Sequence, residues 1–285
     1  MKFAFFGGEP LSVPVLDRLL SAGYKPNLII TGPDRKSGRG LVLVSPPTKI
    51  WGERHGVTVL QPESLKDQES LELLFRDDWD VFVVAAYPKI IPARILNLPK
   101  HGSINLHPSL LPLLRGPSPI RSAILEDLRE TGVSIMKMDE EMDHGPILAS
   151  RRLDNLEMNW PPFGPDLDRA LTQLGADLLV ETLPRYVAGE IVPEPQDHSR
   201  ATYTRKFDKE DALLDLNGDP YRNLLKIKAF AGSPGAYFFQ DGKRVKVIDA
   251  SLDKDGQLSI ERVVPEGKKE MSYRDFLSGT DGSTR

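Results

Sequence analysis

The stretch Ser103-Ile-Asn-Leu-His-Pro-Ser-Leu-Leu-Pro-Leu-Leu-Arg-Gly-Pro-Ser-Pro119 begins with the alternating pattern of a strand and continues as a loop with four prolines. Asn105 and His107 lie two residues apart, so a strand places their side chains on the same face. The loop that follows is stiff, because each proline fixes its φ angle and removes a backbone donor. A polar pair at a strand end, followed by a rigid loop, is typical of the way a parallel-sheet domain presents a site.

The segments around this stretch predict an α/β domain with a parallel sheet. A buried strand over Lys2–Phe6, the Gly7-Gly8 turn, a helix over Ser12–Ala22 and a strand over Asn27–Thr31 together form a βαβ unit. The apolar run Val81–Ala86 is typical of a central parallel strand. Further helices are predicted over residues 46–55, 65–75, 90–97, 118–129 and 166–189, and further strands over 57–60 and 133–138.

The C-terminal part of the sequence has a different pattern. Residues 190–204 contain two prolines and many polar groups, which is typical of a linker. Beyond them a helix is predicted over Tyr221–Phe230, and short strands over 236–240, 245–250 and 258–264 are separated by Asp-Gly turns. We therefore predict a Rossmann-like domain over residues 1–189, a linker over 190–204, and a small β-barrel of the oligonucleotide-binding type over 205–285.

Composition limits the kind of chemistry that this chain can carry. It has 285 residues, a formal net charge of −4 and no cysteine. Disulfides, thiolate metal sites and a cysteine nucleophile are therefore excluded, and the histidines show no metal-ligand spacing, so no metal site is predicted. The apolar run at the N-terminus is too short for a signal peptide, and no segment reaches a membrane-spanning length. We predict a cytoplasmic protein that has no membrane partner and is a monomer.

The residue types near the central stretch favour direct attack by a substrate group on a carbonyl-type carbon. The amide of Asn105 can donate a hydrogen bond to a developing oxyanion, and His107 can add a second donor or relay a proton. Asp143, just before a His-Gly-Pro turn, can orient the imidazole of His107. Each residue also has a purely structural interpretation, as a turn asparagine, a packed histidine and part of a solvated acidic turn.

The segment Gly32–Gly40 combines three glycines with three basic side chains. Its composition is typical of an exposed loop. It fits a solvated connector between elements, and it also fits a loop that contacts an anion.

The motifs of this chain resemble those of the formyltransferase family that uses 10-formyltetrahydrofolate. The resemblance rests on Asn105–Pro112, Arg115–Pro119, Gly132–Asp139 and Asp143–Pro146, and it extends through nearly the whole chain. In particular, the chain resembles the family members that formylate methionyl-tRNA. That closer resemblance rests on the basic loop with Pro33-Asp-Arg and Gly38-Arg-Gly, the linker segment 196–206, and the barrel motifs at 226–230 and 267–269.

The resemblance implies that Asn105, His107 and Asp143 are the catalytic residues and that no metal is required. It implies attack by the free amino group of methionyl-initiator tRNA on the formyl group of 10-formyltetrahydrofolate, which is the co-substrate. The residues that it places around the folate are Ser109, Leu110, Leu111, Pro112, Ala86, Tyr87 and Ile90. The residues that it assigns to tRNA contact are Arg35, Arg39, Lys206 and Lys268.

Three residues depart from the pattern of the family. Pro88 stands where a glycine is usual, Arg121 where a glutamine is usual, and Leu216 where a tryptophan is usual. The segment between Leu258 and Gly267 also lacks a stretch that is usual in the family. These departures concern the folate contacts and the barrel, and they leave the three catalytic positions intact.

Three other functions are compatible with parts of this sequence. A sugar-nucleotide N-formyltransferase would share the catalytic residues and the folate donor but would need no basic RNA-binding barrel. A formyltetrahydrofolate hydrolase usually carries an additional N-terminal domain. A non-catalytic RNA-binding protein with a degenerate transferase domain is an alternative of another class, which the intact Asn105, His107 and Asp143 disfavour.

Overall fold

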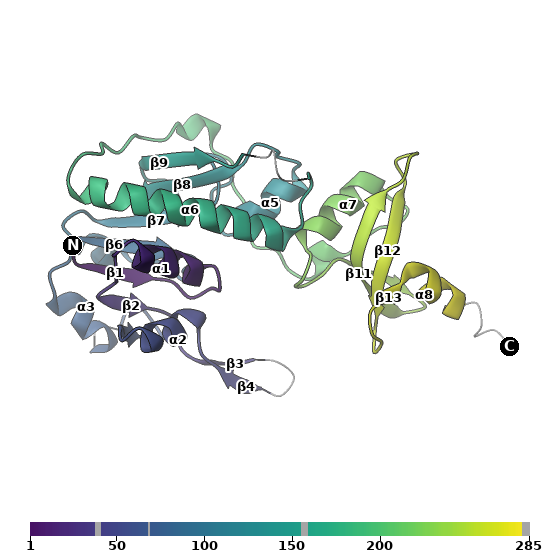
Figure 1. The fold of residues 1–285 in the computed structure, drawn as a ribbon, viewed down its shortest axis with the longest axis horizontal. Coiled ribbons are helices and arrows are strands. Elements are labelled where there is room, and N and C mark those ends of the chain that lie inside the picture. Colours follow the sequence, from purple (N-terminus) through teal and green to yellow (C-terminus); the bar gives the residue numbers. More distant parts are fainter. Residues whose placement is uncertain (38–40, 68, 155–158, 281–285) are drawn as a thin grey trace. The chain divides into compact units, whose positions relative to one another are not determined.

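The computed structural model describes residues 1–37, 41–67, 69–154 and 159–280 (Figure 1). The chain divides into two compact units. The first consists of residues 1–116, 132–153 and 169–203, and the second of the described residues within 117–131, 154–168 and 204–285. The second unit thus combines the C-terminal stretch with two segments from earlier in the sequence.

A seven-stranded sheet forms the centre of the first unit. Its strands follow the order β5 (Thr58–Leu60), β2 (Leu28–Ile30), β1 (Phe3–Phe6), β6 (Val81–Ala85), β7 (Ser103–His107), β8 (Gly132–Lys137) and β9 (Ile147–Arg152). The pairs from β5 to β7 are parallel, which confirms the Rossmann-like α/β prediction. The pairs β7–β8 and β8–β9 are antiparallel, and a hairpin loop joins β8 to β9.

Helices flank this sheet. They are α1 (Ser12–Ser21), α2 (Pro47–Arg54), α3 (Glu72–Arg76), α4 (Ala93–Leu96) and α6 (Gly164–Val187). The helix predicted over 65–75 is much shorter than expected, since α3 begins only at Glu72. Asp67 explains the difference: its carboxylate accepts a hydrogen bond from the Glu69 backbone, and its carbonyl accepts one from the Ser70 hydroxyl. Such local bonds compete with a helix.

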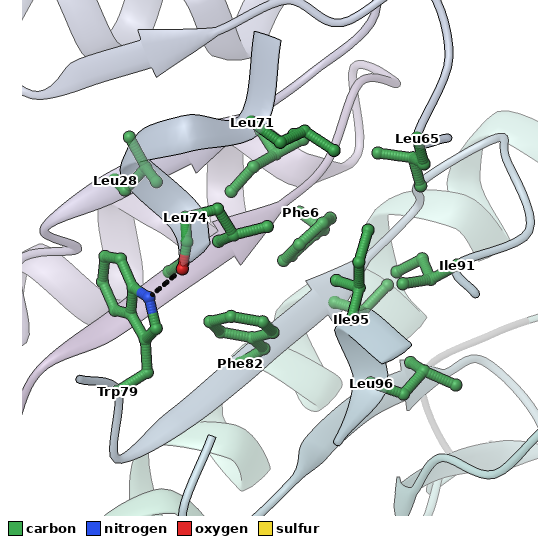
Figure 2. Close-up of a cluster of buried hydrophobic side chains, with 13 residues drawn as sticks. Phe6, Leu28, Leu65, Leu71, Leu74, Trp79, Phe82, Ile91, Ile95 and Leu96 are labelled. Atoms are coloured by element: carbon green, nitrogen blue, oxygen red, sulfur yellow. Dashed lines mark hydrogen bonds between the residues drawn. The ribbon is translucent and has the colours of Figure 1, made fainter. Parts of the chain in front are cut away.

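A cluster of buried apolar side chains covers one face of the sheet (Figure 2). Phe6 and Phe82 project from the two central strands into this cluster, and Trp79 closes one side of it with a 2.8 Å hydrogen bond from Nε1 to the carbonyl of Leu74. The other members labelled in Figure 2 are Leu28, Leu65, Leu71, Ile91, Ile95 and Leu96. The cluster holds α3 and α4 against the sheet by the burial of apolar surface.

The alternation of strand β7 decides which way its polar residues point. Leu106 packs against α6, where a Cβ atom at Gly175 would lie only 2.8 Å from Leu106 Cδ2. Asn105 and His107 therefore project from the opposite face. Asn105 is in register with Val84 of β6, so this is the face that carries the apolar cluster.

Two short strands on either side of residues 38–40 were not expected from the sequence, which predicted an exposed loop over Gly32–Gly40. Strands β3 (Arg35–Ser37) and β4 (Val42–Val44) form an antiparallel pair, in which Arg35 is opposite Val44. Residues 38–40, which include Arg39, lie outside the described part of the chain. The side chains of Leu41, Val42, Leu43 and Val44 are all exposed.

The second unit contains an antiparallel sheet and three helices. Its strands are β10 (Tyr237–Gln240), β11 (Lys243–Leu252), β12 (Leu258–Pro265) and β13 (Met271–Ser272), and its helices are α5 (Pro119–Leu125), α7 (Pro220–Ala229) and α8 (Tyr273–Thr280). Asp241 and Gly242 join β10 to β11 with φ angles of 51° and 74°, the left-handed conformation of a two-residue hairpin turn. The sheet is consistent with the predicted small barrel domain.

Three elements of the second unit differ from the prediction. The helix predicted over 118–129 ends at Leu125, because Asp127 takes a φ of 54° and the Leu128 amide donates back to Ala123. This is the hydrogen-bond pattern of a Schellman cap. The sequence analysis also missed β13 and α8. The two-residue β13 is too short to give a periodic signal.

The 24-residue helix α6 is continuous, and charged side chains occur along its length. Within the described ranges, no helix combines the length and the apolar character that crossing a membrane would require.

Two isoleucines five positions apart test the contribution of the apolar cluster. Ile95 is 0% exposed and Ile90 is 83% exposed. We expect Ile95→Ala to lower the free energy of unfolding by about 2–5 kcal/mol, because it removes packed methyl groups and leaves a cavity. The control Ile90→Ala should change it by no more than about 0.5 kcal/mol. Urea unfolding followed by tryptophan fluorescence measures both, and equal losses would contradict a contribution of the apolar cluster to stability.

Candidate functional site

Three residues that the sequence singled out meet at the carboxylate of Asp143. Asn105 Nδ2 lies 3.5 Å from Asp143 Oδ1, and His107 Nδ1 lies 3.6 Å from Asp143 Oδ2. The backbone N–H of Gly116 donates a 2.8 Å hydrogen bond to the same Oδ2 atom. The structure therefore brings all three side chains together, although Asp143 is 38 positions from Asn105 in the sequence.

Asp143 belongs to the loop 138–146, which connects β8 to β9 and folds over the polar face of β7. Its φ angle of 51° is in the left-handed region, which a residue with a side chain seldom adopts. The loop is closed by a 2.8 Å hydrogen bond from the Lys137 amide to the Pro146 carbonyl. Gly145 is required at its position, since a Cβ atom there would lie 1.9 Å from the carbonyl oxygen of Lys137.

The hydrogen bonds of His107 assign a role to each ring nitrogen. The ring is 4% exposed, and Nε2 lies 3.1 Å from the carbonyl oxygen of Leu114. A carbonyl can only accept, so Nε2 carries a hydrogen and Nδ1 faces Asp143. In the neutral ring Nδ1 is a proton acceptor. When Nδ1 takes up a proton, the adjacent carboxylate stabilises the resulting imidazolium.

The side-chain amide of Asn105 makes fewer hydrogen bonds with the described residues than it is able to form. Its side chain is half-buried, and its one hydrogen bond among the described residues is the 3.5 Å contact to Asp143, which is longer than the usual range. An amide held on a strand beside a histidine can donate to an oxygen atom that gains negative charge.

A buried arginine lies next to this site and was not singled out as a site residue from the sequence. Arg115 is 1% exposed, and its guanidinium donates to Gln196 Oε1 at 2.7 and 3.1 Å. It also lies 2.9 Å from His198 Nδ1 and 3.3 Å from the Tyr203 hydroxyl. Arg115 and Gln196 both belong to motifs quoted above for the family resemblance, which is the only signal in the sequence that points to them.

Two of the residues predicted to border the folate are held inside the protein. Ser109 is 1% exposed and donates to the Leu113 carbonyl at 2.6 Å. Leu111 is 7% exposed, and its amide donates to Ser134 Oγ at 3.1 Å. Leu110, which lies between these two residues, and Pro112, which follows them, are half-buried.

The other predicted folate residues follow the end of β6. The Ala86 carbonyl accepts hydrogen bonds from the Gly8 and Glu9 amides at 3.2 and 3.3 Å, which joins the carboxyl ends of β1 and β6. Ile90 is open to solvent. The Tyr87 hydroxyl is buried without a hydrogen-bond partner among the described residues, and burial raises the pKa of Tyr87 to about 12.

A pocket of about 360 Å³ lies between α4 and the loop that carries Asp143. It is lined by Ala93, Leu96, Asn97, Lys137, Met138, Asp139, Glu140 and Pro146. Asp139 also accepts a 2.7 Å hydrogen bond from His144 Nδ1. This volume is within the range of small-molecule sites, and the lining combines apolar and charged groups.

The residues predicted to contact tRNA have exposed side chains where the structure describes them. Arg35 lies on β3 in the first unit, and Lys206 and Lys268 lie in the second unit. Arg39 lies outside the described residues.

The departures from the family pattern have distinct surroundings. Pro88 is exposed, and a Cβ atom at Gly8 would lie 3.4 Å from its Cδ. Arg121 forms a paired salt bridge with Asp168, in which both nitrogen–oxygen distances are 2.7 Å. Leu216 is 41% exposed.

Comparison with known proteins identifies relatives of this chain. The family model for formyl transferase matches residues 1–160. The methionyl-tRNA formyltransferase of Chloroflexus aggregans is 44% identical over 255 residues, covering 88% of this chain and 81% of that protein. The protein of the same name from Halalkalibacterium halodurans is 36% identical over 308 residues, covering 98% and 95%. A methionyl-tRNA formyltransferase structure from Clostridium thermocellum superimposes with a TM-score of 0.63 at 17% identity, covering 93% of this chain and 98% of that one.

Proposed function

The chain belongs to the methionyl-tRNA formyltransferase family, and we propose that it transfers a formyl group from 10-formyltetrahydrofolate to the α-amino group of methionyl-initiator tRNA. The observation that supports this most strongly is the extent of the relationship. Relatives of that name match this chain through both compact units rather than through the sheet domain alone.

The arrangement around Asp143 suits attack by an amine on a formyl carbon. As the new carbon–nitrogen bond forms, the formyl oxygen gains negative charge, and the Asn105 amide can donate to it. His107 Nδ1 can accept the proton that the attacking amine loses, and the Asp143 carboxylate then lies 3.6 Å from the imidazolium. When the bond between the formyl carbon and N10 breaks, the proton held by the imidazolium can pass to N10, so that tetrahydrofolate leaves neutral at that nitrogen.

His107 has a narrower role in this scheme than the sequence alone suggested. Its Nε2 hydrogen is already donated to the Leu114 carbonyl, so this nitrogen is not a free donor for an oxyanion. We assign proton transfer to Nδ1 and oxyanion stabilisation to Asn105. This division follows from the one hydrogen bond that fixes the ring.

We assign the folate co-substrate to the pocket between α4 and the loop 138–146. The pocket is lined by residues of α4 and by Met138, Asp139, Glu140 and Pro146 of the loop that also carries Asp143. Ile90, which is exposed and lies three positions before α4, can add apolar contact. These features fit a co-substrate that is apolar in part and polar at its edges.

Incubation of the protein with 10-formyltetrahydrofolate and two alternative acceptors tests this function. We expect formylated product with methionyl-tRNA and none with an aminosugar nucleotide. Product with the sugar nucleotide alone would favour the sugar N-formyltransferase, and tRNA binding without product would favour a non-catalytic RNA-binding protein.

Removal of the Asn105 amide tests the assignment of the oxyanion donor. We expect Asn105→Ala to lower kcat by about two to three orders of magnitude, as removal of a single oxyanion donor does in other enzymes. Asn217, an exposed asparagine of the second unit, provides the control, and Asn217→Ala should retain normal turnover. Near-normal turnover of Asn105→Ala would remove Asn105 from the chemistry.

Substitution of Arg35 tests the assignment of exposed basic residues to tRNA. We expect Arg35→Ala to raise the KM for methionyl-tRNA and to reduce the salt dependence of tRNA binding by about one phosphate contact, while the KM for the folate is unchanged. Lys25→Ala, which removes an exposed cation from the turn before β2, is the matched control. An equal effect of Arg35→Ala on both substrates would argue for a structural role.

A further inference from the structure

The segment Glu194–Tyr203 is held against both loops that build the site, although its sequence is typical of a linker. Glu194 and Ile147 exchange two backbone hydrogen bonds of 2.8 Å, just beyond the loop that carries Asp143. Thr202 accepts from the Leu114 amide through its hydroxyl at 2.8 Å and from the Arg115 amide through its carbonyl at 2.9 Å. The segment is therefore a fixed part of the first unit up to Tyr203.

Gln196 lies between the two loops and bonds to both. Its Nε2 donates to the Asp143 carbonyl at 2.9 Å and to the Gly145 carbonyl at 2.7 Å. Its Oε1 accepts the two hydrogen bonds from Arg115. Carbonyls can only accept and a guanidinium can only donate, so the orientation of the Gln196 amide is fixed from both sides.

Arg115 anchors this amide because the guanidinium is buried and keeps its charge. Within the described residues, Arg115 forms no ion pair with a carboxylate, and its acceptors are Gln196, His198 and the Tyr203 hydroxyl. A buried charge needs its full set of hydrogen bonds, so Gln196 Oε1 is strongly held. The residue after Arg115 is Gly116, whose amide donates to the Asp143 carboxylate.

The backbone of Asp143 needs such a support. Its left-handed conformation is unfavourable for a residue with a side chain, and bonds to its main chain must therefore hold it. The hydrogen bond from Gln196 to the Asp143 carbonyl acts at that strained residue. A shift of this residue would move the carboxylate away from His107, Asn105 and the Gly116 amide together.

We propose that Gln196 is a positioning residue for the Asp143 carboxylate and that Arg115 fixes the orientation of the Gln196 amide. The inference rests on the proposed function, in which Asp143 supports formyl transfer. Gln196 acts through Asp143. Both Nε2 hydrogens and the Oε1 atom of its amide form hydrogen bonds within the protein, so the amide is not available to a substrate.

Gln196→Glu is the sharpest test, because it keeps the size of the side chain and an acceptor for Arg115. It removes both Nε2 hydrogens and places a carboxylate oxygen beside the carbonyls of Asp143 and Gly145. We expect kcat to fall by about 10- to 100-fold while the KM values for both substrates stay unchanged, since small displacements of catalytic groups have effects of this size. The matched control is Gln173→Glu, at an exposed position of α6, which should retain wild-type turnover.

A double-mutant comparison separates positioning from a general structural role. If Gln196 acts through the Asp143 carboxylate, Gln196→Glu should cause no further loss of kcat in an Asp143→Asn background. Additive losses, or normal turnover of Gln196→Glu alone, would overturn the proposal. If Gln196→Glu fails to fold, Gln196→Met, which removes the two donors without adding charge, takes its place in the same comparison.

Amide hydrogen exchange supplies a readout that does not depend on activity. The Gly116 amide is protected by its 2.8 Å bond to Asp143 Oδ2, and we expect that protection to be lost in Gln196→Glu but kept in Gln173→Glu. Unchanged exchange at Gly116 would reject the positioning role whatever the activity. If the unsubstituted protein formylates neither acceptor, the proposed function is rejected. Loss of Gly116 protection in Gln196→Glu would then still support the positioning role.

Discussion

The candidate site depends on a change of strand direction at β7. Because β7 is parallel to β6 and antiparallel to β8, the hairpin loop after β8 begins near Ser103, at the amino end of β7. The loop then folds back over the face that carries Asn105 and His107, and Asp143 reaches both side chains. If β8 were parallel to β7, the loop after β8 would begin at the carboxyl end of β7 instead.

The polar groups of the site constrain one another because they are shielded from water. His107 gives its Nε2 hydrogen to a carbonyl, which leaves one nitrogen for proton transfer beside Asp143. Arg115 keeps its charge in a buried position and orders the amide of Gln196, which in turn holds the backbone of Asp143. Buried donors and acceptors that must all be paired give a site with little freedom to rearrange.

The two tasks proposed for this chain require opposite environments. Formyl transfer needs donors that are held in place and partly shielded, which is the condition of Asn105 and His107 on the sheet. Contact with the phosphates of a tRNA needs exposed cations, which is the condition of Arg35, Lys206 and Lys268. The family relationship, which spans both compact units, joins these environments in one chain.

Local patterns in the sequence were sufficient for most strands of the two larger sheets, although not for β9 or β13. They were also sufficient for the Asp-Gly turn at 241–242 and for the placement of Asn105 and His107 on one face, since the period of a strand is a local property. Only the tertiary structure brought Asp143 to that face, turned Ser109 and Leu111 inward, and joined Arg115 to Gln196 across 81 positions. The physical reason is that a hydrogen bond between distant residues depends on sheet direction and on the packing of two loops. Neither is encoded in the residues that lie next to one another in the chain.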